Sequence, residues 1–257
     1  MISEHAIIDS SAIISANVSI GPWAFIGPNV VIGEGTIIGP HVVIENNTTI
    51  GKNNQIFQFS SVGTAPQDVN YKGEPTKLEI GDNNVIREYS TVSRGSAKNG
   101  LGTTKIGNNN YLMAYTHIGH DCVLGNHIIM VNYSGLSGHV TVHDAANIGA
   151  YAGVHQFCHI GASSFIGRAT YISKDVLPYL MISGYDAATC GINVVGLRRR
   201  GFSAEAIDII RKAYKIIFRS GFVVAQALDE LLQLVPSCNE LTPMIEMLRA
   251  TERGIVR

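Results

Sequence analysis

The chain has 257 residues, which is enough for one large domain or two small ones. Its formal net charge of −1 and its 15% of charged residues exclude the strongly basic balance of a nucleic-acid-binding protein. Polar and charged residues within positions 3–9 interrupt any signal-peptide core, and no apolar run approaches the roughly 18 residues of a membrane span. The four cysteines show no disulfide or metal spacing. We therefore expect a cytoplasmic protein with reduced thiols.

Aliphatic residues recur at every sixth position along residues 8–62, 80–92 and 106–172. Glycine often follows the aliphatic residue, and a small or β-branched residue commonly stands four positions after it. One inward aliphatic per six residues is typical of a hexapeptide β-helix, in which three repeats make one triangular coil of about 18 residues. The sequence therefore predicts a mainly β fold with roughly eight stacked coils.

Two interruptions of the repeat predict loops near residues 63–79 and 93–105. The first interruption, GTAPQDVNYKGEPTKLE, is polar and contains two prolines. The second, SRGSAKNGLGTTK, is rich in glycine, and we expect it to be a flexible surface excursion. Loops on regular scaffolds frequently carry function, so both are candidates for the walls of a site.

Helical spacing replaces the repeat near the C-terminus. Residues 203–221 carry apolar residues at intervals of three and four, with Ser203 as the expected N-cap and Gly221 as the expected stop. Further amphipathic helices are predicted over residues 222–234 and about 240–250.

The sequence thus divides into a β-helix domain, residues 1–190, and an α-helical domain, residues 191–257. The helical part carries more Lys and Arg than Asp and Glu, whereas the β-helix part shows the reverse. This bias favours an anionic ligand or an acidic partner at the helical end.

The stretch THIGHDCVLG, residues 116–125, concentrates side chains that move protons or bind ligands. Residues 18 apart stack on successive coils of a hexapeptide β-helix, so Gly138 should lie directly above His120. The same register collects several polar side chains along one edge of the coil: His117, His120, Asp121, His139, His155 and Gln156.

Two chemistries fit this cluster. General base catalysis needs a neutral imidazole, a carboxylate that orients it and a donor for a developing oxyanion, and His120, Asp121 and the Gly138 N–H supply this set. A zinc site resembling that of hexapeptide-repeat carbonic anhydrases could use His117, His120 and His139. An HxxH pair on a β-helix directs its imidazoles apart, however, and a metal site leaves the helical domain without a role. We favour general base catalysis without a metal or other cofactor.

Five segments, together with the hexads, carry a family resemblance. They are PQDVNYKGEPT (66–76), HIGHDC (117–122), SGHV (137–140), VHQFC (154–158) and GLRRRGFS (196–203). In this combination the sequence resembles, over essentially its whole length, the UDP-N-acetylglucosamine O-acyltransferases of lipid A biosynthesis. The resemblance implies a homotrimer of left-handed parallel β-helices with active sites between subunits. It also implies transfer of a 3-hydroxyacyl chain from acyl carrier protein to the 3-hydroxyl of UDP-N-acetylglucosamine.

The resemblance assigns a role to each candidate residue. His120 would be the general base, Asp121 would orient it, and the Gly138 N–H would hold the thioester oxyanion. Residues expected to bind the sugar or the acyl chain are Gln67, Asp68, Asn70, His117, His139, His155 and Gln156. Residues expected to hold the uridine diphosphate are Asn193, Arg199 and Arg200, because guanidinium forks suit phosphate. The basic helical domain would meet the acidic carrier protein.

Three positions depart from the family pattern. Asn70 stands where a lysine is common and Val195 where a glutamate is common, which leaves open a 3-amino sugar as the acceptor. Arg168 stands where a glycine admits long acyl chains, and its bulk predicts a donor of about ten carbons or fewer unless the side chain turns outward. A coenzyme A donor is a further alternative. An ice-binding β-helix is disfavoured because the threonines form no regular array.

Overall fold

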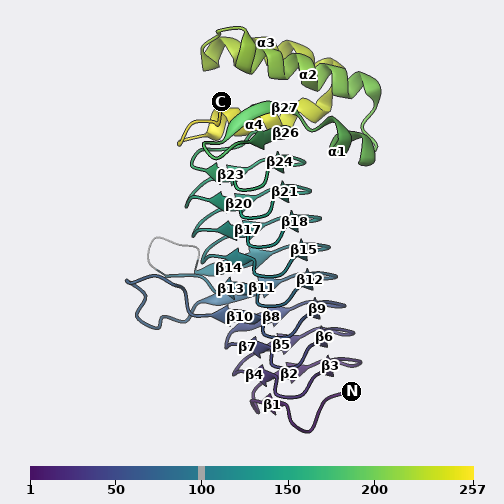
Figure 1. Ribbon diagram of the computed structural model, residues 1–257, viewed down its shortest axis with the longest axis vertical. Helices are drawn as coiled ribbons and strands as arrows, with labels where there is room; N and C mark the ends of the chain where they lie inside the picture. Colours follow the sequence, from purple (N-terminus) through teal and green to yellow (C-terminus); the bar gives the residue numbers. More distant parts are fainter. Residues whose placement is uncertain (98–101) are drawn as a thin grey trace.

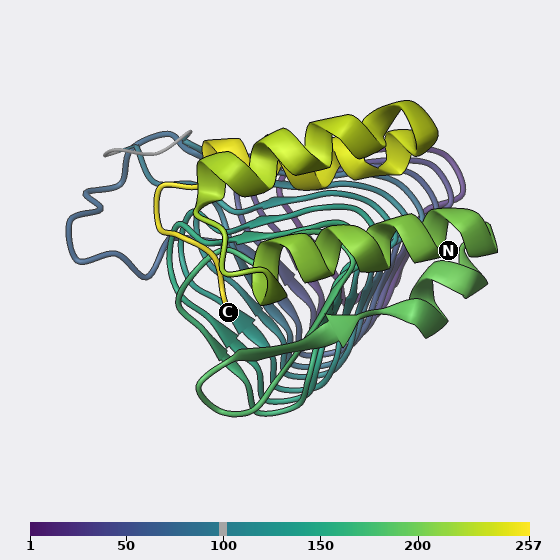
Figure 2. The same cartoon turned by 90° about the horizontal axis from the view of Figure 1, so that it is seen from above.

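A computed structural model describes residues 1–97 and 102–257 as a tall triangular coil with helices across one end (Figures 1 and 2). The chain starts at the bottom of the coil in Figure 1 and climbs towards the helices. Short strands on the three faces pair in parallel with the strands one coil above and below them. The predicted left-handed parallel β-helix with C-terminal helices is therefore confirmed.

Three sheets form the faces of the coil, and each is named here after its first strand. Within the described chain, the nine-stranded β1 sheet contains β1 (Ile7–Ile8), β4 (Phe25–Ile26), β7 (Val43–Ile44), β10 (Ser61–Thr64), β13 (Thr91–Ser93), β16 (His117–Ile118), β19 (Gly135–Leu136), β22 (Gly153–Val154) and β25 (Tyr171–Ile172). The described β2 sheet has eight strands: β2 (Ile13–Ile14), β5 (Val31–Ile32), β8 (Thr48–Ile50), β11 (Lys77–Ile80), β14 (Thr103–Ile106), β17 (Val123–Leu124), β20 (Thr141–Val142) and β23 (His159–Ile160). The ten described strands of the β3 sheet are β3 (Ser19–Ile20), β6 (Ile37–Ile38), β9 (Gln55–Ile56), β12 (Val85–Ile86), β15 (Tyr111–Leu112), β18 (Ile129–Met130), β21 (Asn147–Ile148), β24 (Phe165–Ile166), β26 (Leu180–Ser183) and β27 (Ala188–Ile192).

The six-residue period fixes which side chains enter the coil. From Ile20 to Ile172 the aliphatic residue that ends each repeat is buried, with an exposed fraction of at most 3%. Burying such a side chain contributes about 1.5–3 kcal/mol, so the stacked column of isoleucine, valine and leucine is the main stabilising element of the fold. Three positions after most of these aliphatics the chain turns a corner, and the residue there adopts a positive φ, as in Asp121 (57°) and His139 (62°).

The two predicted loops project from the edge between the β1 and β2 sheets. The first connects β10 to β11. Both strands have four residues instead of the two found in most coils, so each strand extends into the predicted loop. The second connects β13 to β14, and part of it, residues 98–101, lies outside the described residues. The expectation of a surface excursion is wrong for residues 93–96, which are buried against the coil.

The helical end contains α1 (Val194–Arg199), α2 (Ala204–Arg219), α3 (Val224–Leu234), α4 (Thr242–Ala250) and two 3₁₀ turns, η1 (Val235–Ser237) and η2 (Asn239–Leu241). Ser203 caps α2 as predicted, since its hydroxyl accepts the Ala206 N–H. The sequence did not predict α1 or the antiparallel β26–β27 hairpin, whose second strand crosses the expected boundary at residue 190. Among the described residues, no helix is both long and apolar enough to cross a bilayer.

Candidate active site

A cavity of about 410 Å³ lies on the outer surface of the β1 sheet, beside its edge with the β2 sheet. Several successive coils and both loops contribute to its wall. The lining residues are Gln67, Ser93, His117, Gly119, His120, Gly135, Leu136, Ser137, Gly138, Gly153, Val154, Gln156 and Tyr171. Five of the residues singled out from the sequence therefore face one space: Gln67, His117, His120, Gly138 and Gln156.

His120 and Asp121 form a hydrogen-bonded pair at the corner between β16 and β17. His120 Nδ1 lies 2.8 Å from Asp121 Oδ2, and the Asp121 side chain is fully buried. The Asp121 carboxylate also accepts the Ser96 N–H at 2.9 Å, while its own N–H donates to Thr104 Oγ1 at 2.9 Å. A buried carboxylate held from several sides fixes the imidazole with Nδ1 as the donor, which leaves Nε2 as the free base.

Gly138 lies directly above His120, as the 18-residue register predicts. A Cβ atom placed on Gly138 would come within 2.6 Å of both Cε1 and Nε2 of His120. The imidazole therefore occupies the space that any larger residue at position 138 would fill. The nitrogen that can act as a base thus lies against the Gly138 backbone.

The Gly138 N–H donates to no residue that the structure describes. The coil does not need this donor, because proline, which lacks an N–H, stands at the equivalent corner position in residues 22, 28 and 40. A free backbone N–H beside an imidazole is a suitable donor for an oxyanion that develops next to the base.

Two further histidines flank the pair as neutral imidazoles. Burial lowers the pKa of His117, whose Nδ1 lies 2.7 Å from Thr91 Oγ1, and neighbouring His120 lowers it further. Burial also lowers the pKa of His139, against a smaller opposing effect of Asp121. The His139 ring stacks on Phe157, with 4.4 Å between centroids, and its Nε2 lies 3.9 Å from Asp121 Oδ2.

The two loops meet over the buried carboxylate. Ser96 Oγ donates to Asp68 Oδ2 at 3.1 Å while the Ser96 N–H binds Asp121, so one residue links the first loop to the pair of His120 and Asp121. The Asn70 N–H donates to Asp68 Oδ1 at 2.9 Å, and this contact lowers the pKa of Asp68. Asp68 is consequently an anion held next to the cavity.

Arg94 holds the first loop against the coil. Its guanidinium is almost completely buried, donates to the Gly63 carbonyl at 2.9 Å and reaches the Tyr71 hydroxyl at 3.1 Å. The same group lies 4.0 Å from the Glu45 carboxylate. A planar donor of this kind can fix several partners at once, so Arg94 sets the position of the loop that carries Asp68.

Other predicted site residues lie elsewhere in the chain. Asn193, Arg199 and Arg200 line a separate cavity of about 740 Å³ on the β3 sheet, where the Asn193 side chain caps α1 by accepting the Gly196 N–H. His155 is half-buried and lies 3.2 Å from the Arg253 guanidinium. Arg168 is exposed at the corner between the β3 and β1 sheets. One copy of the chain therefore does not bring Asn193, Arg199 and Arg200 to the cavity of His120.

The structure groups possible metal ligands differently from the zinc hypothesis. Within the described chain, His120, Asp121 and His139 form the one trio whose ligand atoms lie within 4.8 Å of one another. His117 is not part of this trio, since its Nδ1 is engaged with Thr91. A metal ion bound by the trio would replace the hydrogen bond between His120 and Asp121, so metal binding and general base catalysis are competing uses of the same atoms.

Comparison with known proteins identifies the family of this chain. Residues 175–256 match the family described as Udp N-acetylglucosamine O-acyltransferase; Domain 2, and residues 103–138 match the bacterial transferase hexapeptide family. The acyl-[acyl-carrier-protein]–UDP-N-acetylglucosamine O-acyltransferase of Ectopseudomonas mendocina is 52% identical over 256 residues, covering 100% of this chain and 99% of that protein. The chain belongs to the UDP-N-acetylglucosamine O-acyltransferase family.

Solved structures of this family agree over the full chain. LpxA from Acinetobacter baumannii is 49% identical and superposes with a TM-score of 0.97, covering 100% of this chain and 99% of that one. The UDP-N-acetylglucosamine O-acyltransferase of Moraxella catarrhalis is 44% identical, with the same coverage and TM-score. The resemblance drawn from the sequence is thus confirmed, and the chain is an acyltransferase.

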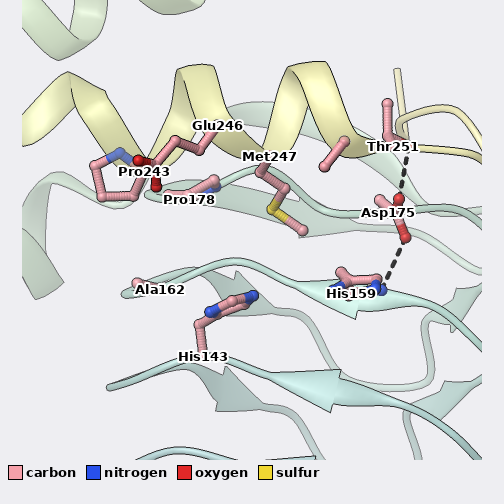
Figure 3. A pocket seen from close by; sticks show the side chains of 10 residues that line it. His143, His159, Ala162, Asp175, Pro178, Pro243, Glu246, Met247 and Thr251 are labelled. Atoms are coloured by element: carbon pink, nitrogen blue, oxygen red, sulfur yellow. Dashed lines mark hydrogen bonds between the residues drawn. The ribbon is translucent and has the colours of Figure 1, made fainter.

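A third cavity in this family member, of about 300 Å³, lies between α4 and the upper coils of the β2 sheet (Figure 3). His143 and His159 form its floor, with 6.2 Å between ring centroids. Asp175 accepts the His159 N–H at 2.8 Å and the Thr251 hydroxyl at 2.6 Å. The Asp175 carboxylate thus joins the C-terminal end of α4 to the coil.

Sequence reasoning missed several residues of the O-acyltransferase site. Ser96, Arg94 and Thr104 lie in or beside the second interruption, where the repeat no longer gives a register. Tyr171 could have been found, because it continues at 18-residue intervals the outward-facing series that starts at His117.

Proposed function

We propose that the chain transfers a 3-hydroxyacyl group from acyl carrier protein to the 3-hydroxyl of UDP-N-acetylglucosamine, the first step of lipid A biosynthesis. The observation that carries the proposal is the His120 imidazole, held by Asp121 through Nδ1 and packed against Gly138 at its other nitrogen. The names of the relatives point to the same donor and acceptor.

The reaction follows from this arrangement. His120 Nε2 takes the proton of the sugar 3-hydroxyl as the oxygen attacks the thioester carbon. The carbonyl oxygen becomes an oxyanion that accepts the Gly138 N–H, and Asp121 stabilises the imidazolium. Collapse of the tetrahedral intermediate breaks the carbon–sulfur bond, and the leaving thiolate takes the proton back from His120. These steps use side chains and backbone alone, without a metal or other cofactor.

The remaining candidates would surround the reacting atoms. Neutral His117 and His139, with Gln156 and Gln67, offer hydrogen bonds to hydroxyl and amide groups of the sugar and the acyl chain. Asp68 would accept a sugar hydroxyl, with Asn70 beside it. His155 would contact substrate from the rim, where Arg253 orients it. Asn193, Arg199 and Arg200 would hold the uridine diphosphate.

We further propose a homotrimer in which each site forms between two copies. Eight stacked rings form a ridge along the corner between the β3 and β1 sheets, and successive centroids from His41 to Tyr151 are 4.8–5.2 Å apart. The ridge consists of His5, Trp23, His41, Phe59, Tyr89, Tyr115, Tyr133 and Tyr151. An exposed aromatic ridge of this length is typical of an interface. Three copies meeting at their ridges would set the β1 sheet of one copy against the β3 sheet of the next.

Mixing two inactive variants tests this arrangement. His120→Ala and Arg200→Ala should each lose transfer, because one lacks the base and the other a diphosphate contact. Co-expression should restore activity at about a quarter of the sites, where the intact β1 sheet of one variant meets the intact β3 sheet of the other. No recovery in trimers shown to contain both variants would place both residues in a site made by one copy.

Donor and acceptor are tested together by mass spectrometry of the product. The enzyme is offered 3-hydroxyacyl carrier proteins and the corresponding coenzyme A thioesters, with UDP-N-acetylglucosamine or its 3-amino analogue. We expect transfer from the carrier protein to the 3-hydroxyl and near-complete loss in His120→Ala with the oligomer intact. Preference for the amine would connect Asn70 and Val195 with a changed acceptor. Metal analysis of the active protein tests the zinc alternative.

Two finer proposals complete this function. A cytoplasmic location is supported by the four cysteines, which are all free.

Arg168 would shorten the acyl chain by narrowing the rim of the groove, so Arg168→Gly should extend the donor preference beyond about ten carbons. An unchanged preference would assign the arginine to the solvated surface.

A further inference from the structure

Three consecutive residues, here called the clamp segment, follow β13 and lie buried against the coil: Arg94, Gly95 and Ser96. The N–H of Arg94 donates to the Thr64 carbonyl at 3.0 Å, where the first loop begins. The N–H of Gly95 donates to the Lys77 carbonyl at 3.0 Å, where that loop ends. The clamp segment therefore closes the base of the first loop through its backbone.

The first loop depends on polar contacts for its position. Each of residues 67–75 is exposed or half-buried, so this stretch gains little from apolar packing. The Arg94 guanidinium is only 8% exposed and donates to the Gly63 carbonyl at 2.9 Å and to the Tyr71 hydroxyl at 3.1 Å. The Tyr71 N–H in turn donates to the Asp68 carbonyl at 3.0 Å. Arg94 thus holds the part of the loop from which the Asp68 side chain extends.

Ser96 binds a carboxylate with each of its two donors. Its hydroxyl donates to Asp68 Oδ2 at 3.1 Å, and its N–H donates to Asp121 Oδ2 at 2.9 Å. The same Asp121 oxygen lies 2.8 Å from His120 Nδ1. The backbone beside Ser96 has little room to shift, because a Cβ atom on Gly95 would lie 2.2 Å from backbone atoms at the start of β14. One tightly packed residue therefore contacts both Asp68 and the carboxylate that holds the imidazole.

We infer that Arg94 and Ser96 are positioning residues of the acyl transfer, which couple the placement of Asp68 to the orientation of His120. This inference rests on the proposed function, in which Asp68 accepts a hydroxyl of the sugar. Neither Arg94 nor Ser96 is among the residues that line the described cavity of His120, so each acts through another side chain. A change in the clamp segment should therefore weaken binding of the acceptor more than binding of the donor.

Ser96→Ala removes the hydroxyl that donates to Asp68 and keeps the N–H that binds Asp121. A hydrogen bond to a charged group is worth about ten-fold or more, so KM for UDP-N-acetylglucosamine should rise about ten-fold. The kcat and the KM for the acyl donor should stay within about three-fold, because His120 keeps its partner. Ser90→Ala is the matched control, since it removes a buried hydroxyl that donates to the Met113 carbonyl inside the coil, and both KM values should stay unchanged.

A double-mutant cycle separates positioning from a general loss of structure. Asp68→Ala should raise the acceptor KM by itself, because it removes the carboxylate that Ser96 places. Adding Ser96→Ala to this variant should then have little further effect, since the interaction that it removes is already lost. Two changes that weaken the fold independently would multiply their effects on the acceptor KM instead.

Arg94→Lys tests the other positioning residue. Lysine keeps the positive charge but lacks the planar fork that reaches Gly63 and Tyr71 together. The acceptor KM should rise, and kcat should fall on the order of ten-fold, because the clamp segment also carries the N–H that binds Asp121. The kinetics are measured at a temperature at which circular dichroism shows each variant to be folded.

An acceptor KM within about three-fold of the wild type in Ser96→Ala or in Asp68→Ala would overturn the inference and leave the proposed function standing. Effects of these two changes that multiply, or wild-type kinetics in Arg94→Lys, would overturn it as well. Failure of the wild-type enzyme to acylate UDP-N-acetylglucosamine from any 3-hydroxyacyl carrier protein would instead refute the proposed function.

Discussion

Replacing Gly138 by alanine perturbs the site with a single methyl group. The Cβ atom would lie 2.6 Å from Cε1 and Nε2 of His120, whereas carbon atoms in contact prefer about 3.5–4.0 Å. The imidazole must therefore move by about 1 Å. This movement strains the 2.8 Å hydrogen bond to Asp121 and takes the base out of line with the sugar hydroxyl.

A misplacement of about 1 Å in a catalytic group costs on the order of 100-fold in rate, so we expect Gly138→Ala to lower kcat by about that factor. The fold should tolerate the change. Gly138 has no positive φ, and replacing glycine by alanine at a compatible backbone position stabilises by about 0.4–1 kcal/mol through the unfolded state.

Steady-state kinetics with the preferred donor, together with thermal unfolding, checks this expectation. Gly135→Ala is the matched control, because it adds the same methyl group three residues away, where the nearest contact is 3.8 Å. The control should keep kcat within about three-fold, well below the 100-fold effect of misplacement. The reasoning is refuted if Gly138→Ala keeps more than a third of the wild-type kcat, or if both variants lose activity equally.

Three further outcomes are expected. Thr91→Val removes the 2.7 Å contact with His117 Nδ1 and should raise KM several-fold at nearly constant kcat, and a selective fall in kcat would contradict a binding role for His117. Because burial lowers the pKa of His117 and His139 below the unfolded value of about 6.5, the unfolded state binds more protons between these values. Stability should rise with pH from about 5 to 7, and a Tm that is constant over this range would contradict it. Thr251→Val, which removes the 2.6 Å contact with Asp175, should lower the free energy of unfolding by about 1–2 kcal/mol in chemical denaturation, while an unchanged midpoint would argue against this anchoring contact.

The sequence predicted the coil because each hexad has the same environment. One inward aliphatic per repeat determines both the strand positions and the stacking, so a distance of 18 residues translates directly into spatial contact. The register placed Gly138 above His120 and His139 above Asp121, as the contacts now show. Within the uninterrupted coils, a count of residues was sufficient.

The register fails wherever residues are inserted. Ser96 reaches Asp121 across 25 residues, and this distance follows from the course of the second loop rather than from the repeat. The burial of Arg94 depends on a carbonyl and a hydroxyl in the first loop, which no periodic pattern relates to it. The β26–β27 hairpin and α1 lie beyond the last hexad, where short segments carry too little periodicity to predict their conformation.

The coil does not need the N–H at the position of Gly138, and at this corner an imidazole lies beside it. A proline at the Gly138-equivalent position of other coils shows that the corner N–H is dispensable to folding. Such a donor becomes useful where an imidazole lies beneath it and the position above has no side chain, as at His120 and Gly138. The Ser96 N–H of the second loop then binds the buried Asp121 carboxylate that holds the imidazole. The catalysis that we propose at this corner therefore depends on the missing side chain of Gly138 as much as on His120 and Asp121.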